Sequence, residues 1–352
     1  MNEYMRVTFI HHANDKFYSG THFDNTHYNF LVRALSEHPD VEYTRLPISE
    51  EFDATSLKDK TDAVILSAIR DYNIPKITGL KSLDVPVLAK VGDFHDSKRY
   101  GTGGKNYDDW GVDCLFNFMH SQYFYDWYPT HMNYKTIFFG VEPSLYETPK
   151  PYDQRIKGQI LVSGAVDQGD PLTRMPYLRW IPRHMRYSIK RQLIWVRRLT
   201  EPNVSIYRKI RYPHHTQYYF YKLRTDCKLL PYVTDQTKYA CNLPYEQLLY
   251  NYCGAIAATT FYPTIKYWEI AAAGCLTFME ITKRNYGSYL GFRDGVNCVT
   301  INEHNYHEKF KKFLDNPDSY SSIAAMGRKY ALKNFSNDVA TNRLVSLIRE
   351  FI

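Results

Sequence analysis

Short apolar runs recur along the first 120 residues of the chain, each bounded by polar residues. They lie at 6–12, 62–68, 85–93 and 112–118, and apolar and polar positions alternate little within them. Runs of this kind indicate strands that are buried on both faces of a parallel sheet. Between the first two runs, residues 27–39 show the apolar spacing of a helix. Strands that alternate with helices predict an α/β fold.

A polar stretch with three prolines, residues 142–158, is typical of a linker between domains. A second α/β series follows it. Its strand-like runs lie at 159–165, 204–210 and 297–301, and its helical segments at 174–199, 304–315 and 317–333, with an amphipathic tail at 338–352. Because 352 residues exceed what one hydrophobic core usually fills, we predict two domains that meet near residue 150.

The composition is that of a globular protein, with 44% hydrophobic and 23% charged residues. No apolar run approaches the roughly 20 residues of a membrane helix, and the first residues lack a signal pattern, which predicts a cytoplasmic protein. The cysteines have neither disulfide-framework nor zinc-ligand spacing, so we expect small core residues rather than metal ligands. They are Cys114, Cys227, Cys241, Cys253, Cys275 and Cys298.

Positive charge is concentrated between Pro171 and Lys228, where fourteen Lys and Arg residues face two acids. The basic, aromatic part at 174–199 predicts peripheral contact with an anionic membrane surface on the cytoplasmic side. A merely solvated basic face is the alternative, because Pro176 and Pro182 interrupt the helical pattern. Nucleic acid is disfavoured, since no recognised binding motif accompanies the charge.

The segment KYWEIAAAGCLTFME, residues 266–280, predicts a short helix followed by a strand. Thr264 is placed to cap the start of the helix, and Gly274 to end it in a left-handed conformation. Lys266 and Glu269, three residues apart, share one helix face. A helix start after a strand favours anions, so Lys266 is a candidate for a diphosphate and Glu269 for ribose hydroxyls. An ordinary surface ion pair is the alternative.

Residues 266–301 and 310–336 resemble the carboxyl-terminal domain of GT-B glycosyltransferases of the group-1 type, especially their CgeB-like branch. The pattern is carried by Lys266, Glu269, Gly274, Glu280, Asp294, Gly295, Asn316 and Pro317. Two further stretches, 138–147 and 162–174, are similar to the interdomain turn and to the start of the nucleotide-binding domain. The larger retaining families carry a second glutamate where this chain has Phe261, so the stereochemistry of transfer stays open.

The resemblance implies a GT-B fold, which consists of two Rossmann-like domains facing each other across a cleft. Residues 1–150 would form an acceptor-side domain and 151–337 a nucleotide-sugar-binding domain, with helix 338–352 crossing back to the first. It also implies contacts to the nucleotide sugar. They would come from Lys266, Glu269, Thr264, Arg174, Gly164 and Gly20.

Catalysis without a metal ion or other cofactor is the expectation, because GT-B enzymes stabilise the leaving diphosphate with basic side chains and helix dipoles. The chain also has no Asp-X-Asp triplet. The loop 91–97 supplies the candidate base, with His95 and Asp93 following a predicted strand. A polar loop in which Asp caps a helix is the alternative.

The predicted activity is transfer of a hexose from a nucleotide sugar to a glycan, a lipid-linked or a protein-bound acceptor. The resemblance implies a UDP-sugar as donor, with a GDP-sugar as the alternative. Two other functions share the fold. One is epimerisation of a sugar nucleotide, and the other is binding of a nucleotide sugar or glycan without turnover.

Overall fold

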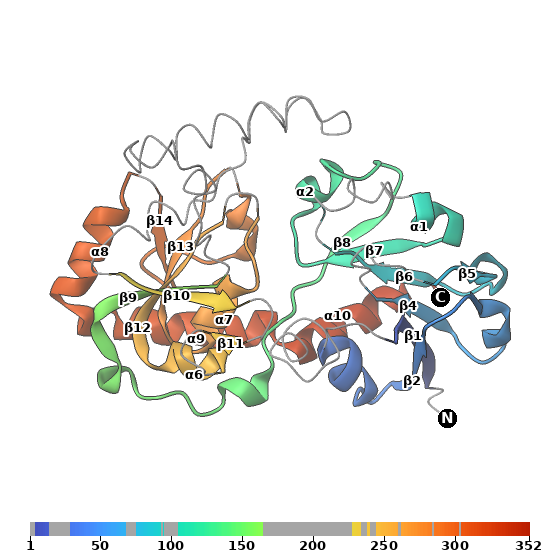
Figure 1. The fold of residues 1–352 in the computed structure, drawn as a ribbon, viewed down its shortest axis with the longest axis horizontal. Helices are drawn as coiled ribbons and strands as arrows, with labels where there is room; N and C mark the ends of the chain where they lie inside the picture. Colours follow the sequence, from blue (N-terminus) through green and yellow to red (C-terminus); the bar gives the residue numbers. More distant parts are fainter. Residues whose placement is uncertain are drawn as a thin grey trace, which may run out of the picture. The chain divides into compact units, whose positions relative to one another are not determined.

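The computed structural model describes residues 4–13, 29–67, 75–92, 94, 105–164, 227–233, 238–239, 244–259, 262–283, 285–302 and 304–352. The chain divides into two compact units. The first unit consists of Met1–Pro143 and Lys333–Ile352, and the second of Ser144–Leu332. The chain therefore leaves the first unit once and returns to it through its last helices (Figure 1).

A six-stranded sheet with the order β2-β1-β4-β6-β7-β8 forms the centre of the first unit (Figure 1). All neighbouring strands are parallel. Every residue of β4, β6 and β7 is buried, which confirms the interpretation of the apolar runs. The strands are β1 (Met5–His12), β2 (Val41–Ile48), β4 (Ala63–Leu66), β6 (Val87–Lys90), β7 (Cys114–Asn117) and β8 (Tyr134–Thr136).

The strand β2 lies at an edge of this sheet, in a stretch that contains no continuous apolar run. Of its eight residues, only Val41 and Ile48 are buried. Edge strands commonly carry polar residues that limit pairing with other chains. The sequence pattern therefore did not distinguish this strand from a loop.

Two helical segments pack together in the first unit. The π-helical turn η3 (Phe30–Ala34) lies within the helix predicted over 27–39, and the closing helix α10 (Asn337–Arg349) contacts it. The Thr341 hydroxyl donates a 2.8 Å hydrogen bond to the carbonyl of Phe30. The Ser336 side chain caps α10 by accepting from the backbone N–H of Val339. The predicted return of the last helix to the first unit is confirmed.

The second unit also contains a six-stranded sheet, in the order β11-β10-β9-β12-β13-β14. Its strands are parallel except for the short β11, which is antiparallel to β10. Helices α8 and α9 cover one face through a core that includes Phe278, Phe310 and Phe313. The strands are β9 (Ile156–Gly164), β10 (Cys227–Val233), β11 (Lys238–Tyr239), β12 (Tyr252–Ala257), β13 (Leu276–Glu280) and β14 (Val299–Ile301).

Two helices of the second unit follow the segments predicted over 304–315 and 317–333, whereas the predicted helix 174–199 and strand 204–210 lie outside the described residues. α8 ends at Asp315, immediately before the Asn-Pro pair, and α9 begins after a 3-10 turn. Helices α6 and α7 pack against β12, and α7 also packs against β13. The helices are α6 (Tyr245–Tyr250), α7 (Lys266–Ala272), α8 (Tyr306–Asp315) and α9 (Ser321–Phe335).

The remaining elements are short and lie in connections. β3 (Phe52–Asp53) and β5 (Ile77–Thr78) form a two-stranded parallel pair in the first unit. The short helices of the first unit are η4 (Ala54–Leu57), η5 (Leu80–Ser82), α1 (Lys105–Trp110) and α2 (Ser121–Tyr125). In the rest of the described chain they are η7 (Pro143–Tyr146), η8 (Tyr152–Gln154), η11 (Gly287–Leu290) and η12 (Pro317–Tyr320).

The segment predicted as a linker, 142–158, is held against the second unit. The Tyr250 hydroxyl donates to the carbonyl of Leu145 at 2.8 Å, and Arg328 donates to the carbonyl of Tyr146. β9 begins at Ile156, inside the predicted linker. Two of its prolines stand at the start of 3-10 turns, Pro143 as the first residue of η7 and Pro151 as the residue before η8. The hydrogen bonds to distant residues could not be seen in the local pattern.

Candidate functional site

The topology of the second sheet locates a candidate site at the carboxyl end of β9. In chain order β9 is the first strand of this sheet, with β10 on one side and β12 on the other. Open parallel sheets bind ligands in the crevice outside the carboxyl ends of such strands, where the strand order reverses. β9 ends at Gly164 and β12 ends at Ala257.

Helix α7, which carries the two predicted charges, ends as its sequence predicts. Gly274 has a φ of 73°, and this left-handed conformation favours glycine. The N–H of Gly274 donates to the carbonyl of Ala271, and that of Cys275 to the carbonyl of Ile270. These two bonds form a Schellman motif, which satisfies carbonyls at the helix end.

The start of α7 differs from the prediction. The helix begins at Lys266, and its cap residue is Ile265, which makes no side-chain capping hydrogen bond. Thr264 takes part through its backbone, since its carbonyl accepts from the N–H of Tyr267 at 3.0 Å. The predicted capping role of Thr264 is wrong because the turn before the helix already has helical geometry at Ile265, which leaves the cap position one residue later.

Lys266 brings its ammonium group to the carboxyl end of β9. Its Nζ donates a 2.5 Å hydrogen bond to the carbonyl of Ser163, the residue before Gly164. Burial lowers the pKa of Lys266 to about 8, and the nearby Glu269 carboxylate offsets part of that effect. The chain therefore keeps a strongly desolvated amine at the position where the topology predicts a ligand.

Glu269 lies one helical turn after Lys266 and is only 5% exposed. Its carboxylate lies close enough to Tyr146 to act on it electrostatically. Burial raises the pKa of the Tyr146 phenol well above its usual value, and the charge of Glu269 raises it further. The Tyr146 hydroxyl is buried and has no hydrogen-bond partner among the described residues. A carboxylate and a phenol thus share a desolvated region beside α7.

Further polar residues hold the strand ends around α7. The Ser163 and Tyr245 hydroxyls lie 3.2 Å apart. The hydroxyl of Tyr267 donates to the carbonyl of Glu280 at 3.0 Å, and the side-chain amide of Asn285 donates to the same carbonyl at 2.6 Å. The sequence pattern did not predict these contacts, because no short motif marks residues that meet only through the fold.

The carboxyl-terminal end of α7 is fixed by a buried arginine. Arg155, 6% exposed, donates to the carbonyl of Ala273 at 2.9 Å and to that of Lys150 at 2.8 Å. A guanidinium at the end of a helix complements the negative end of its dipole. The segment that enters the second unit is therefore tied directly to the helix that carries Lys266 and Glu269.

The other predicted site residues divide into two groups. Gly164 is the last residue of β9 and pairs with Pro231 of β10, so it lies beside the carbonyl that binds Lys266. Four lie outside the described residues, as does the basic segment 174–199. They are Asp93, His95, Arg174 and Gly20.

Asp294, part of the family-like pattern, has a structural role. Its carboxylate accepts from the N–H of Thr300 at 2.8 Å and from the ammonium of Lys309 at 2.7 Å. These bonds hold its pKa below the usual value although partial burial acts in the opposite direction. The neighbouring Gly295 has a φ of 69°, as a tight turn requires.

Three findings concern other kinds of site. Within the described ranges, no group of three or more His, Cys, Asp or Glu residues is arranged to hold a metal ion. No helix in the part of the chain that the structure describes is long and apolar enough to cross a membrane. Cys114, Cys253, Cys275 and Cys298 are buried free thiols, as predicted for core residues.

Comparison with known proteins supports the two-unit α/β fold described above. Residues 191–346 match the family model described as glycosyl transferase-like. HepE of Anabaena in complex with UDP is 12% identical, with a TM-score of 0.52 over 98% of this chain and 100% of HepE. The fold is GT-B.

Two other solved structures are similar over nearly their whole length. A glycosyltransferase from Rickettsia africae is 10% identical, with a TM-score of 0.52 over 100% of this chain and 99% of its own. Sucrose-phosphate synthase from Thermosynechococcus elongatus is also 10% identical, with a TM-score of 0.52 over 98% of each chain. No curated protein matches the chain in sequence. Likeness at these identities concerns the GT-B architecture.

Proposed function

We propose that the protein is a glycosyltransferase of the CgeB-like branch that moves a hexose from a UDP-sugar to an acceptor, without a metal ion. The acceptor would be a glycan, a lipid-linked or a protein-bound molecule. A GDP-sugar is the alternative donor. The GT-B fold and the family match over 191–346 support this class of activity.

The observation that supports it most directly is the position of Lys266 at the carboxyl end of β9. An ammonium group has three N–H donors, so Lys266 can bond the Ser163 carbonyl and also donate to a diphosphate. A desolvated cation interacts more strongly with a phosphate than an exposed one. An anion bound beside Lys266 would offset the cost of burying it.

Glu269 is the proposed partner of the ribose hydroxyls. A buried carboxylate on the helix that carries the phosphate-binding lysine can accept from two vicinal hydroxyls. Gly164 would let the diphosphate approach the backbone, Thr264 would contribute from the turn before α7, and Arg174 and Gly20 remain proposed contacts. HepE, which shares the fold, was crystallised with UDP and with UDP-glucose. This supports uracil as the base of the donor nucleotide.

In the proposed reaction, the bond between the sugar C1 and the diphosphate oxygen breaks, and a bond forms between C1 and an acceptor oxygen. In an inverting enzyme, His95 or Asp93 would accept the proton of the acceptor hydroxyl. In a retaining enzyme, the departing diphosphate would accept it. Lys266 would stabilise the charge that develops on the diphosphate.

A panel of UDP-, GDP- and dTDP-sugars tests the proposal. Calorimetry should show binding of UDP, and chromatography should show slow hydrolysis of one UDP-sugar or its transfer to an added acceptor. EDTA should leave both unchanged. Isomerisation of the sugar would indicate an epimerase, and binding without turnover would indicate a binding module. Absence of binding by all three nucleotides would contradict the transferase, the epimerase and the nucleotide-sugar-binding module, and would leave only binding of a glycan.

A further inference from the structure

The turn that follows β13 is held by one buried amide, Asn285. This side chain is fully buried, and its Oδ1 accepts hydrogen bonds from the N–H groups of Thr282 and Gly287, each at 3.0 Å. Between them, Tyr286 has a φ of 59°, a left-handed conformation that is costly for a residue with a side chain. Asn285 therefore keeps the turn in a shape that the backbone alone would not favour.

The amide nitrogen of Asn285 reaches beyond this turn. Its Nδ2 donates to the carbonyl of Glu280, the last residue of β13, at 2.6 Å. It also lies 3.3 Å from the carbonyl of Thr259, two residues after the end of β12, and 3.3 Å from the hydroxyl of Tyr267 on α7. One side chain thus joins the ends of two neighbouring strands to a helix.

Tyr267 is the residue through which α7 is attached to this network. It is fully buried, and its hydroxyl donates to the Glu280 carbonyl at 3.0 Å, so it is the acceptor in the contact with Asn285. The hydroxyl of Thr259 lies 3.2 Å from the same oxygen. Because these neighbours come from the ends of both strands, the hydroxyl of Tyr267 is held in one position.

The first turn of α7 is held by side chains that bond the strand ends. The cap residue, Ile265, makes no side-chain capping hydrogen bond. Lys266 ties the turn to the carbonyl at the end of β9, and Tyr267, the next residue, ties it to the ends of β12 and β13. Because a hydrogen-bonded helical turn moves as one piece, a shift of Tyr267 would move Lys266 and Glu269 with it.

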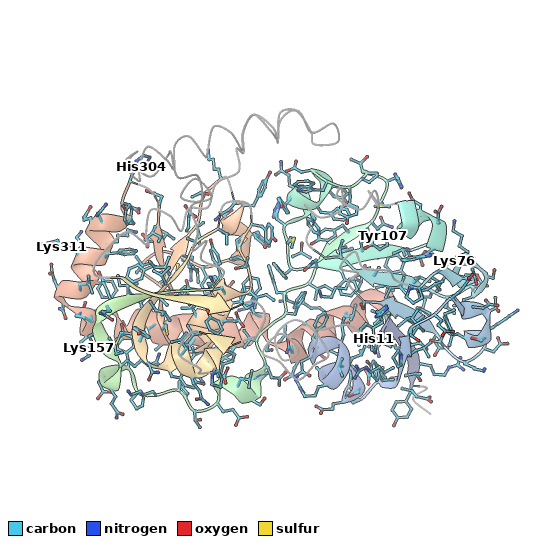
Figure 2. All side chains as sticks on the ribbon, in the orientation of Figure 1. His11, Lys76, Tyr107, Lys157, His304 and Lys311 are labelled. Atoms are coloured by element: carbon cyan, nitrogen blue, oxygen red, sulfur yellow. The ribbon has the colours of Figure 1, made fainter. Side chains whose placement is uncertain are left out.

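The network lies at the same edge of the second sheet as the candidate site. Its members follow β12 and β13, and β12 pairs with β9, the strand whose end Lys266 contacts. In Figure 2, His304, three residues after β14, marks this carboxyl edge, and Lys157, near the start of β9, marks the amino edge. Because Asn285 is fully buried, it can act on a ligand only through the residues that it holds.

We propose that Asn285 is a positioning residue for the nucleotide-sugar site. Through Tyr267 it fixes the first turn of α7, so that Lys266 meets the diphosphate and Glu269 the ribose of the same ligand. The inference rests on the proposed function, and it assigns a part in donor binding to a residue that would not touch the donor. A local role, in which Asn285 stabilises only its own turn, is the alternative.

Two variants remove the attachment from its two sides. Asn285→Ala deletes the amide, and Tyr267→Phe deletes only a hydroxyl and leaves the bonds of Asn285 within its own turn. Calorimetry should give a Kd for UDP about tenfold higher in each variant than in the wild type, since binding groups tolerate little displacement. The double variant should bind UDP within about twofold of the weaker single variant, because both changes remove one shared interaction. A Kd within twofold of the wild type in Tyr267→Phe would leave Asn285 with the local role and overturn the inference.

Comparison of UDP with UMP separates positioning from a loss of stability. A smaller folded fraction weakens both ligands by the same factor, whereas displacement of Lys266 affects the ligand with the second phosphate more. The wild type should prefer UDP to UMP at least tenfold, and both variants should reduce this preference to about threefold or less. A weaker Kd with an unchanged preference would show a structural role alone and overturn the inference.

Matched variants near the amino ends of strands are the controls. Asn297, buried in the turn before β14, accepts from the N–H of Arg293 at 2.7 Å, and the hydroxyl of Tyr152, before β9, donates to the carbonyl of Pro317 at 3.3 Å. Asn297→Ala and Tyr152→Phe remove these bonds and should leave the Kd for UDP within twofold of the wild type. Losses equal to those of Asn285→Ala and Tyr267→Phe would overturn the inference.

Binding by the wild type separates this inference from the proposed function. Failure of the wild type to bind any of UDP, GDP and dTDP would remove the proposed function, and absence of a preference for UDP over UMP would remove the phosphate role of Lys266. If the wild type binds GDP instead of UDP, GDP and GMP take the places of UDP and UMP. If Asn285→Ala does not fold, Tyr267→Phe, which lacks a single oxygen atom, still has to raise the Kd and lower the preference.

Discussion

At the scale of single residues, Lys266 combines a thermodynamic cost with a proposed function. Its pKa of about 8 in the folded protein is below the usual lysine value, because burial disfavours the ammonium form. Between about pH 8 and pH 10.5 the unfolded chain binds more protons than the folded one, so this group makes stability rise with pH in that window. Below pH 8 both states are protonated, and the buried charge lowers stability by its full amount.

Replacement of Lys266 by methionine should therefore separate stability from binding. At pH 7 we expect Lys266→Met to raise stability by about 1 kcal/mol, roughly 2–4 °C in Tm, since an apolar side chain replaces a desolvated charge. The Kd for UDP should rise at least tenfold. Scanning calorimetry with and without UDP measures both. A stabilised variant that still binds UDP normally would contradict the phosphate role.

The ribose role of Glu269 can be tested without relying on stability. Glu269→Gln keeps the shape but removes the charge, and it should weaken UDP binding about 10–100-fold, the value of one or two hydrogen bonds to a charged group. The wild type should also bind UDP more tightly than the analogue without ribose hydroxyls, 2′,3′-dideoxy-UDP. In the variant this difference should vanish. If the variant still discriminates between the two ligands, another residue receives the ribose.

At the scale of elements, the sequence predicted those features of a helix or strand that residues close by in the sequence determine. Apolar runs located β1, β4, β6 and β7, and Gly274 ended α7, because burial and backbone conformation are encoded within a few residues. The polar edge strand β2 carried no such signal. The tie of Arg155 to Ala273 depends on a distant part of the fold, so the pattern could not predict it.

The end of α7 offers a matched pair of glycine substitutions. Gly274→Ala should lower stability by about 1–2 kcal/mol, since the residue is left-handed and its added Cβ would lie 3.3 Å from Nη2 of Arg155. Gly158→Ala in β9 is the control, because nothing lies within 4 Å of that Cβ. Denaturant unfolding compares the two. Equal stabilities of the two variants would show that α7 does not need its left-handed terminus.

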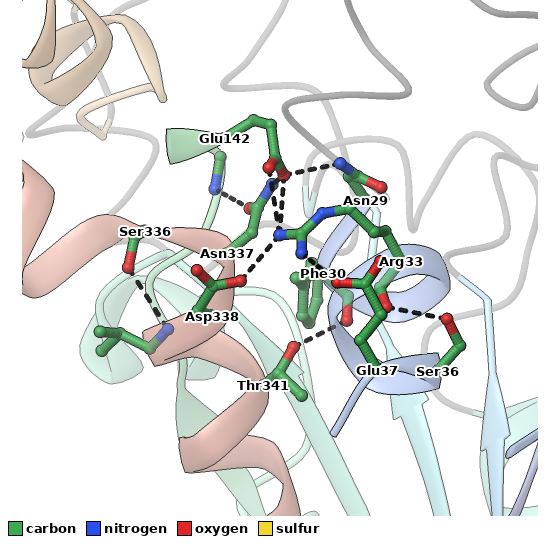
Figure 3. Close-up of polar contacts among 12 residues, drawn as sticks. Asn29, Phe30, Arg33, Ser36, Glu37, Glu142, Ser336, Asn337, Asp338 and Thr341 are labelled. Carbon is green, nitrogen blue, oxygen red and sulfur yellow. Dashed lines mark hydrogen bonds and ion pairs between the residues drawn. The ribbon is translucent and has the colours of Figure 1, made fainter. Parts of the chain in front are cut away.

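At the scale of the whole molecule, the chain leaves and re-enters the first unit at neighbouring positions. Val141 and Ser336 form an isolated parallel bridge, and the N–H of Asn337 donates to the carbonyl of Val141 at 2.8 Å. Glu142 follows in the departing segment, and its carboxylate binds Arg33 of η3 and Asn337 of α10 (Figure 3). Arg33 also binds Asp338 at 2.7 Å. One polar network, in which Glu142 and Asn337 are buried, thus joins three segments distant in sequence.

Because every member of this network belongs to the first unit, its loss should affect that unit alone. Glu142→Ala removes the carboxylate that accepts from Arg33, Asn29 and Asn337. Arg33 keeps its ion pairs with Glu37 and Asp338, so the expected cost is that of the buried donors left unsatisfied, about 1–3 kcal/mol. We expect scanning calorimetry to show the first unit unfolding at a lower temperature while the second unit and its Kd for UDP stay unchanged.

The control for this prediction is Asp318→Ala, which removes the exposed partner of Lys157 in the second unit and should cost under about 1 kcal/mol. Glu142→Gln should be milder than Glu142→Ala, since an amide oxygen can still accept from Arg33 and Asn29. A single transition that shifts as a whole would show that the two units unfold together. In that case the network of Glu142 stabilises the entire chain, and the GT-B halves are not independent in stability.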